Sequence, residues 1–422
     1  MVLTPSQQRR AILAATIGNG IEFYDFLAYA FFAIQIGKTF FPFRDDPFLS
    51  LMASLMAFGA GFATRPLGAF VLGRYADRNG RKPAMLLSMT LMGGGILLLV
   101  LTPGYTTIGI AAPVIAVCAR LIQGFALGGE VGSATAYLVE SADTHRRGAA
   151  VSWQGASQQI AATLGALMGF LLTLRLSEAE LATYGWRIAL LVGALIVPFA
   201  IWIRSSLPET LHKEPEPDEA GHAGVRTYAG VIVLGCLMIG SGTIGTYMFN
   251  YMATFGQRTL HFSAQTSLFA QTGLNFASVL TMLWGGRASD RWGRKRVILI
   301  PQICFVLLLV PVFLWITTTL SPVAFVAGTV LLSGIAGMRD PAIYTLINES
   351  LPRPVRARAF ALIYAIPVAL LGGTTQPFIA WLIEKTGNPL SIAIYLTGVA
   401  AIGLFAMIMA RESSPRHRRS AQ

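Results

Sequence analysis

Hydrophobic residues along the chain gather into long runs separated by short polar segments. Each run is about as long as the roughly 20 apolar residues that a helix needs to cross the hydrocarbon core of a membrane. The runs lie near residues 11–37, 48–74, 83–102, 108–138, 149–173, 186–204, 228–254, 263–286, 297–318, 323–349, 359–382 and 390–410. This pattern predicts an all-α integral membrane protein with twelve transmembrane helices.

The runs form two sets of six, which are separated by a polar stretch with several prolines and acidic residues. It contains Glu214-Pro215-Glu216-Pro217-Asp218-Glu219, a composition typical of a linker. We therefore expect an N-terminal half over 1–204, a cytoplasmic linker over 205–227, a C-terminal half over 228–411 and a basic tail over 412–422.

The positions of Lys and Arg indicate how the chain is oriented. These residues are concentrated in every second connecting segment, on the side of the N-terminus, and are sparse in the other segments. Basic connecting segments stay on the cytoplasmic side of a membrane. We therefore expect both termini to be cytoplasmic.

The composition supports a membrane protein and argues against other classes. Of the 422 residues, 54% are hydrophobic and 12% are charged, whereas about 25% of the residues of a soluble domain are charged. The net charge of +12 is spread between the apolar runs and not gathered on one face, so no nucleic-acid partner is expected. Gly240-Ser241-Gly242-Thr243-Ile244-Gly245 has no acidic residue about 20 positions later, as a dinucleotide site would require. We expect no enzymatic activity, no metal and no cofactor.

A ten-residue segment occurs once in each half of the chain. Gly73-Arg74-Tyr75-Ala76-Asp77-Arg78-Asn79-Gly80-Arg81-Lys82 follows the second run, and Gly286-Arg287-Ala288-Ser289-Asp290-Arg291-Trp292-Gly293-Arg294-Lys295 follows the eighth. Gly, Asp, Arg, Gly, Arg and Lys recur at matched positions, which two unrelated basic turns would not explain. Two parallel six-helix repeats with a substrate site between them are typical of transporters.

These decapeptides resemble the signature loop of the major facilitator superfamily. The resemblance implies the two-repeat major facilitator fold, and it implies that the loops latch the cytoplasmic side and open when the transporter faces inward. A glycine allows close helix approach, and an aspartate can accept hydrogen bonds from the backbone at a neighbouring helix N-terminus. We therefore expect gating roles for Gly73, Asp77, Arg78, Gly80, Arg81, Gly286, Asp290, Arg291, Gly293 and Arg294.

A narrower resemblance covers nearly the whole chain. Three segments, 18–25, 65–68 and 120–130, are similar to the metabolite:proton symporter family, whose members move citrate, 2-oxoglutarate, shikimate, or proline and betaine. Within that family, Ser152-Trp153-Gln154-Gly155-Ala156-Ser157-Gln158-Gln159 is most similar to the citrate and tricarballylate carriers. The resemblance implies proton-coupled transport of a small organic acid.

Several charged residues fall inside the apolar runs, where each costs about 2.5–3.5 kcal/mol at a helix centre. They are Glu22, Asp25, Arg65, Arg120, Glu130, Arg339 and Asp340. Guanidinium groups hold carboxylates with two hydrogen bonds, and a carboxyl group of tunable pKa suits proton coupling. Substrate binding is therefore expected of Arg65 and Arg120, and proton coupling of Glu22, Asp25 and Glu130. The alternative is that these charges only tie helices together.

Amide side chains extend the same polar surfaces. Gln123 shares a helix face with Glu130, seven residues later, and we expect it to bind substrate. Gln158 and Gln159, in a run that also contains Gln154, offer groups that could bind hydroxyl or carboxylate oxygens. Hydrogen bonding between helices is the alternative role. Asn250, Tyr251, Asn275 and Gln376 are weaker candidates in the second half.

Arg339-Asp340-Pro341 departs from the pattern of the citrate carriers, which the chain otherwise resembles. Adjacent helical residues point about 100° apart, so these two charges are not expected to form a self-contained pair. We expect Arg339 to bind a substrate carboxylate from the second half, while Asp340 reaches a neighbouring helix. A purely structural polar network is the alternative.

Together these observations predict a secondary transporter that imports a small organic acid, a citrate-like di- or tricarboxylate first, together with protons by alternating access. Its expected partners are the organic anion, protons and membrane lipid, and we expect it to function as a monomer. A proton symporter for a zwitterionic osmolyte such as proline or betaine is the alternative within this class. From a different class, a non-transporting membrane sensor would share the fold.

Overall fold

The computed structural model describes residues 20, 23–24, 26–43, 46–79, 81–128, 135, 138–139, 142–143, 145–205 and 228–414. Several residues named above lie outside this part of the chain, namely Glu22, Asp25, Gly80 and Glu130. The side chains of Asp77 and Arg81 also lie outside the described part. The same holds for most of the expected linker and for the tail beyond residue 414.

The described residues form helices and no strands, and the long helices overlap the expected apolar runs. In the first half they are α2 (Ala33–Phe40), α3 (Pro47–Ala63), α4 (Arg65–Asn79), α5 (Arg81–Leu101), α6 (Tyr105–Ile108), α7 (Ala111–Leu127), α9 (Arg147–Thr173), α10 (Glu178–Glu180), η1 (Leu181–Gly185) and α11 (Trp186–Ser205). In the second half they are α12 (Ala229–Arg258), α13 (Ala264–Trp292), α14 (Arg294–Thr319), α15 (Pro322–Ser350), α16 (Arg353–Pro367), η3 (Val368–Gly372), α17 (Gly373–Thr386) and α18 (Ser391–Met409).

Seven helical stretches in the described residues are long and apolar enough to cross a membrane. They include α9, α12, α14, α15 and α18, and also two stretches in which consecutive helices run on, 47–75 and 359–386. Large apolar side chains also lie on the outer surface, such as Leu101 and Val323, each 73% exposed. An apolar outer surface of this kind is what a lipid environment favours. The chain is therefore an all-helical, multi-pass membrane protein.

Local sequence explains where several helices begin and end. The Asp46 carboxylate accepts hydrogen bonds from the backbone N–H groups of Phe48 and Leu49, and Pro47 occupies the first helical position of α3. Ser263 caps α13 in a similar way, through the backbone N–H of Thr266. Gly293 separates α13 from α14 with a positive φ of 93°, a conformation that glycine adopts without a steric penalty.

The repeated decapeptide is mostly helical and does not form a loop. Residues 286–292 belong to the last turns of α13, and α14 begins at Arg294, so only Gly293 interrupts the helices. In the first repeat, residues 73–79 belong to α4. The aspartate at position 290 is therefore carried on a helix, and its position is fixed by the helix rather than by a loop conformation.

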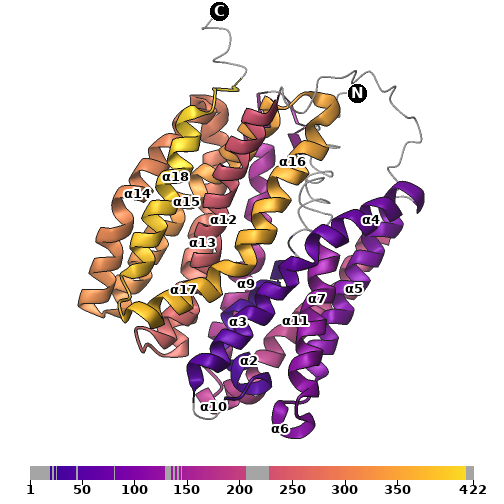
Figure 1. The fold of residues 1–422 in the computed structure, drawn as a ribbon, viewed down its shortest axis with the longest axis vertical. Coiled ribbons are helices and arrows are strands. Elements are labelled where there is room, and N and C mark those ends of the chain that lie inside the picture. The colour runs from indigo at the N-terminus through magenta and orange to yellow at the C-terminus, as the bar shows by residue number, and fades with distance from the viewer. Residues whose placement is uncertain are drawn as a thin grey trace, which may run out of the picture.

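The helices pack as two groups with a shared central region (Figure 1). Contacts between the groups run along α9 and α13 on one side and between α3 and α17 on the other. Glycines allow these contacts: a Cβ on Gly286 would lie 2.5 Å from the carbonyl oxygen of Gly148, and a Cβ on Gly59 would overlap the carbonyl oxygen of Gly373. We call the end of the bundle at which α4, α13 and α18 finish the basic end, because the repeated decapeptides lie there.

Candidate functional site

A cavity lies between the two groups of helices. It is lined by residues of both halves: Phe23, Leu27, Gly155, Gln158, Gln159, Met238, Ile239, Gly242, Thr243, Thr246, Tyr247, Asn250, Met282, Asp340, Ile343, Tyr344, Tyr364 and Val368. Its free volume is about 60 Å³, enough for a few water molecules. Its position between the repeats is the place where transporters of this architecture bind substrate.

Amide and hydroxyl groups supply most of the polar lining. Gln158 and Gln159 reach the cavity from α9, as their helical stripe indicated, and Gln158 interacts with the hydroxyl of Tyr364 on α16. Thr243, Thr246 and Asn250 reach it from α12. Helices of both halves therefore offer hydrogen-bond donors and acceptors to a single space.

Arg120 and Gln123 lie together, but they do not line this cavity. Both are fully buried on α7, and Nη1 of Arg120 donates a hydrogen bond to Oε1 of Gln123. The guanidinium carbon of Arg120 also lies 4.5 Å from the ring centres of Phe26 and Tyr29. Such cation–π contacts offset part of the cost of burying the charge.

Arg65 lies near Arg120 and is held by aromatic rings in the same way. It is 8% exposed and follows Thr64, at which α3 gives way to α4. Its guanidinium carbon lies 4.1 Å from the ring centre of Phe62 and 4.7 Å from that of Phe26. The Phe26 ring therefore contacts both guanidinium groups. Nε and Nη2 of Arg65 are buried without a hydrogen-bond partner among the described residues, so an anionic ligand would satisfy them.

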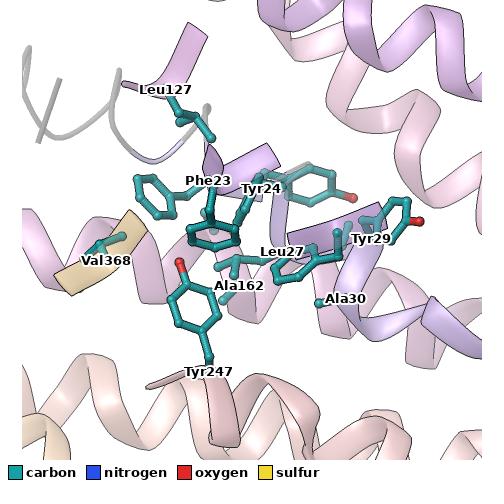
Figure 2. Close-up of a cluster of buried hydrophobic side chains, with 14 of the residues drawn as sticks. Phe23, Tyr24, Leu27, Tyr29, Ala30, Leu127, Ala162, Tyr247 and Val368 are labelled. Atoms are coloured by element: carbon teal, nitrogen blue, oxygen red, sulfur yellow. The ribbon is translucent and has the colours of Figure 1, made fainter. Parts of the chain in front are cut away.

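Tyr247 stands between Arg65 and the cavity. The residue lines the cavity, its ring packs edge-on against Phe62 at 5.1 Å, and its hydroxyl interacts with the guanidinium of Arg65. Figure 2 shows the Tyr247 side chain projecting from the second half of the chain toward the side chains near Phe23 and Leu27, with Val368 beside it. The two arginines of the first half are thus separated from the cavity by aromatic side chains.

The arrangement of Arg339 and Asp340 corrects the expectation from the sequence. Nε of Arg339 lies 3.3 Å from Oδ1 of Asp340, so the adjacent side chains do pair with each other. The expectation that Asp340 reaches a neighbouring helix instead was wrong. Rotation about their side-chain χ angles brings the two charged groups together. The angle between neighbouring Cβ positions does not reveal this rotation. Asp340 lines the cavity, whereas Arg339 lies behind it with its guanidinium carbon 5.0 Å from the ring centre of Phe305.

Sequence reasoning missed the tyrosines of the cavity, Tyr247, Tyr344 and Tyr364, and gave Asp340 no place in it. The signal was present, because each is a polar-tipped residue within an apolar run. Among the weaker candidates, only Asn250 lines the cavity; Asn275 accepts a hydrogen bond from Gln271, and Gln376 donates one to the backbone of Tyr247. Gln376 therefore links α17 to α12, whereas the hydrogen bond of Asn275 stays within α13.

At the basic end, Asp290 joins the two halves of the chain. Its carboxylate accepts hydrogen bonds of 2.9 and 2.8 Å from the backbone N–H groups of Gly148 and Ala149, in the first turn of α9. A carboxylate at a helix N-terminus satisfies donors that the helix itself leaves free and interacts favourably with the helix dipole. The predicted contact between this aspartate and a neighbouring helix start is therefore present in the second repeat.

Arg294 extends this contact into a buried charge network. Its guanidinium lies 2.6 Å from Asp290 and 3.1 Å from Glu349, and its own side chain is 1% exposed. Arg147 of the first half lies 3.8 Å from Glu349. We refer to Arg147, Asp290, Arg294 and Glu349, with the backbone of Gly148 and Ala149, as the latch. Glu349 was not predicted, although it is an acidic residue at the end of an apolar run facing a basic segment.

The residues after α18 close over the latch. The carboxylate of Glu412 accepts hydrogen bonds from the backbone N–H groups of Arg294 and Lys295, at the start of α14, and of Ser413 and Ser414. Burial opposes ionisation of Glu412, but these hydrogen bonds outweigh it and hold its pKa below the ordinary value. The Ser413 hydroxyl donates to Glu349 at 2.7 Å.

The first decapeptide has a more open environment. A Cβ on Gly73 would meet no atom of the described residues within 4 Å, and Arg78 is exposed. In the second decapeptide, Gly286 is packed against α9, and Arg291 is exposed like its counterpart Arg78. The expected gating residues thus occupy two different environments.

Comparison with known proteins supplies the context for this geometry. The family model described as Major Facilitator Superfamily matches residues 23–366 and 237–421. A citrate-proton symporter of Salmonella typhi is 35% identical over 96% of this chain and 95% of its own length. A proline/betaine transporter of Escherichia coli (strain K12) is 28% identical over 100% of this chain and 87% of its own length. The solved structure of a proton:xylose symporter has a TM-score of 0.81 over 98% of each chain at 16% identity, a likeness of fold.

Proposed function

The chain belongs to the Major Facilitator Superfamily as a proton-coupled metabolite transporter, and we propose that it is a symporter that imports a citrate-like di- or tricarboxylate with protons. The observation that carries this proposal is the pair of buried arginines, Arg65 and Arg120, close behind the cavity that both halves line. Guanidinium groups hold carboxylates through paired hydrogen bonds. The similarity to a citrate-proton symporter points to the same substrate class.

The proposed mechanism assigns a role to each group of residues. Arg65, Arg120 and Gln123 would bind substrate carboxylates once Tyr247 moves aside, and Gln158 and Gln159 would bind oxygen atoms that face the cavity. Glu22, Asp25 and Glu130 would carry protons. Arg339 would contribute a guanidinium from the second half.

The proposed topology follows from the same family. Twelve helices would span a bacterial inner membrane, with a first half over 1–204, a linker over 205–227, a second half over 228–411 and a tail over 412–422. The basic end, with both chain termini, would face the cytoplasm, where the latch and the decapeptides would open and close during alternating access. The protein would act as a monomer.

Reconstitution of the purified protein in liposomes tests the substrate. We expect counterflow of labelled citrate, competition by other di- and tricarboxylates, and little competition by proline or betaine. Arg120→Lys keeps the charge but loses the planar fork, so citrate affinity should fall by about 1.5–3 kcal/mol. Lys385, which is on the surface, provides the matched control Lys385→Arg. Unchanged affinity in a folded Arg120→Lys protein would assign Arg120 a structural role.

One observation favours a second substrate class. The cavity lining includes the carboxylate of Asp340 together with Tyr247, Tyr344 and Tyr364, a combination that suits a quaternary ammonium group. Betaine carries a quaternary ammonium group and proline a secondary ammonium group, and a relative of this chain is a proline/betaine transporter. Counterflow of labelled betaine that citrate does not inhibit would replace the first proposal with this one. Absence of exchange for every compound would favour a non-transporting sensor.

A further inference from the structure

Asp340 contributes a charged side chain to the lining of the central cavity. Among the described residues that line it, Asp340 is the one charged side chain, and it extends from the middle of α15. Its side chain is 14% exposed, so its carboxylate reaches the cavity without being open to bulk water. A charged carboxylate at this depth costs several kcal/mol unless it is paired or takes up a proton.

Arg339, which pairs with Asp340, has that carboxylate as its counter-charge. The side chain of Arg339 is 2% exposed, and its hydrogen bond from Nε to Oδ1 of Asp340 measures 3.3 Å. Nη1 of Arg339 is buried without a hydrogen-bond partner among the described residues. The aromatic face of Phe305 is the other neighbour of the guanidinium. Arg339 therefore has spare donors, and it would be left as an unpaired buried charge if Asp340 became neutral.

Among the described residues, few titratable groups lie near Asp340. Tyr344 lies on the same helix, Tyr364 interacts with it from α16, and Tyr247 on α12 lines the same cavity. Arg65 lies beyond Tyr247 and Tyr364. Phenols are uncharged near neutral pH, so Arg339 is the charged group that pairs with Asp340. A proton on Asp340 would remove the counter-charge of Arg339 and leave the phenols unchanged.

We propose that Asp340 is a proton-carrying residue of the second half and that protonation of Asp340 releases Arg339 to bind a carboxylate of the substrate. This inference rests on the proposed function, transport of an organic anion with protons. It explains why a chain would keep two adjacent charges on a membrane helix: the arginine always has one anionic partner, either Asp340 or the substrate.

The exchange conserves charge at each step. A proton from water on the side facing outward binds the Asp340 carboxylate, and the hydrogen bond from Arg339 to Asp340 breaks. A substrate carboxylate then accepts hydrogen bonds from Arg339, so the buried guanidinium is not left as an unpaired charge. After reorientation the substrate leaves, the proton returns to water on the other side, and the pair forms again.

Transport measurements on reconstituted full-length protein separate coupling from binding. Asp340→Asn resembles the protonated state, so citrate counterflow without a gradient should stay within about threefold of wild type. Accumulation of citrate driven by a pH gradient should fall at least tenfold. Wild-type accumulation by the Asp340→Asn protein would overturn the proposal. Lys385→Arg, on the surface, is the control and should leave both accumulation and exchange unchanged.

The double variant distinguishes this role from a structural ion pair. If the pair only balances charge, Arg339→Gln alone leaves Asp340 unpaired, and adding Asp340→Asn should restore accumulation. Under our proposal, Arg339→Gln/Asp340→Asn accumulates no more than either single variant and has a weaker affinity for citrate than Asp340→Asn. Restoration of accumulation by the double variant would overturn the proposal. Thermal denaturation of each variant shows that the protein is folded.

Infrared difference spectroscopy tests the protonation without any substrate. Acidification of the wild-type protein should produce a carboxylic acid C=O band, part of which disappears in Asp340→Asn but persists in Asp46→Asn, an N-cap variant outside the cavity. An unchanged band in Asp340→Asn would contradict a titrating Asp340. A wild-type protein that exchanges no carboxylate would overturn the proposed function and the exchange at Arg339, and the infrared band would still report whether Asp340 titrates.

Discussion

The two copies of the decapeptide share their key residues but differ in what surrounds them. In the second copy, Asp290 accepts hydrogen bonds from the start of α9, and a Cβ on Gly286 would clash with Gly148 and Ser152. In the first copy, a Cβ on Gly73 would meet no atom within 4 Å in the part of the chain that the structure describes. Figure 1 shows the same difference at the level of the helices, because α4 slants away from α16 toward the basic end.

This difference indicates that closure of the bundle depends on the helix that packs against the motif as well as on the motif. In the second copy, the residues of the motif form a latch with a helix of the other half that presents its N-terminus. A motif that can be engaged or free suits a structure with two conformations, because each copy then stabilises the bundle only while its partner helix is in place. The conformation described here is closed along α9 and α13, whereas among the described residues no atom packs against Gly73 of α4.

The strongest test of this comparison is removal of the arginine at the centre of the latch. Arg294→Ala leaves Asp290 and Glu349 as buried carboxylates without their main partner, so the free energy of unfolding should fall by about 3–5 kcal/mol. Thermal and chemical denaturation in detergent measure this loss. Arg291→Ala is the control, since Arg291 is exposed, and it should change stability by less than about 0.5 kcal/mol. Equal effects of the two variants would show that the latch contributes no stability.

The aspartate of the second copy should hold α9 in place. Asp290→Asn removes charged hydrogen bonds worth about 1.5–3 kcal/mol, so the contact between α9 and α13 should open at least tenfold more often. Ser152→Cys, a buried position facing Gly286, reports this opening through its rate of thiol labelling. The native cysteines Cys118, Cys236 and Cys304 are replaced by alanine in this background. A labelling rate that Asp290→Asn leaves unchanged would contradict the role of Asp290.

The matched glycines give the most direct comparison of the two copies. Gly286→Ala places a Cβ 2.5 Å from the Gly148 carbonyl oxygen, and the strain should cost about 1–3 kcal/mol. Gly73→Ala fits the open space and replaces a helical glycine, so it should be neutral or stabilise by about 0.5–1 kcal/mol.

The same pair of glycine variants also sharpens the comparison in transport assays. If Gly73→Ala keeps full stability but slows citrate exchange, then the first copy packs closely in another conformation of the cycle. Equal destabilisation by both variants would instead contradict the difference between the two copies described here.

The smallest effect is expected for the C-terminal segment that covers the second copy. Glu412→Gln weakens the cap on α14 and should cost about 0.5–1 kcal/mol at neutral pH. Because the pKa of Glu412 is lowered in the folded protein, its carboxylate contributes stability above the ordinary glutamate pKa of about 4.3 and loses it as the pH falls through the lowered value. Melting temperatures of wild type and Glu412→Gln should therefore differ between about pH 5 and 8 and converge in stronger acid. A constant difference at all pH values would contradict this.

The sequence by itself determined the helices, the internal repeat and the family. Apolar runs specify membrane helices wherever they occur, because a backbone in lipid must satisfy its own hydrogen bonds. The sequence also indicated several residues of the sites, since Gln158 and Gln159 do line the cavity and Asp290 does contact a helix start. These features depend on residues close in sequence or on one helix face, where spacing fixes direction.

Only the tertiary structure decided which of those residues meet. Arg65 and Arg120 lie behind aromatic rings rather than in the cavity, Asp340 pairs with its neighbour, and Glu349 reaches Arg294 across 55 positions. The asymmetry between the two decapeptides is of the same kind, because their local sequences carry the same motif. Such contacts depend on how helices distant in sequence approach one another, and helix periodicity sets the direction of a side chain but not the partner that it finds.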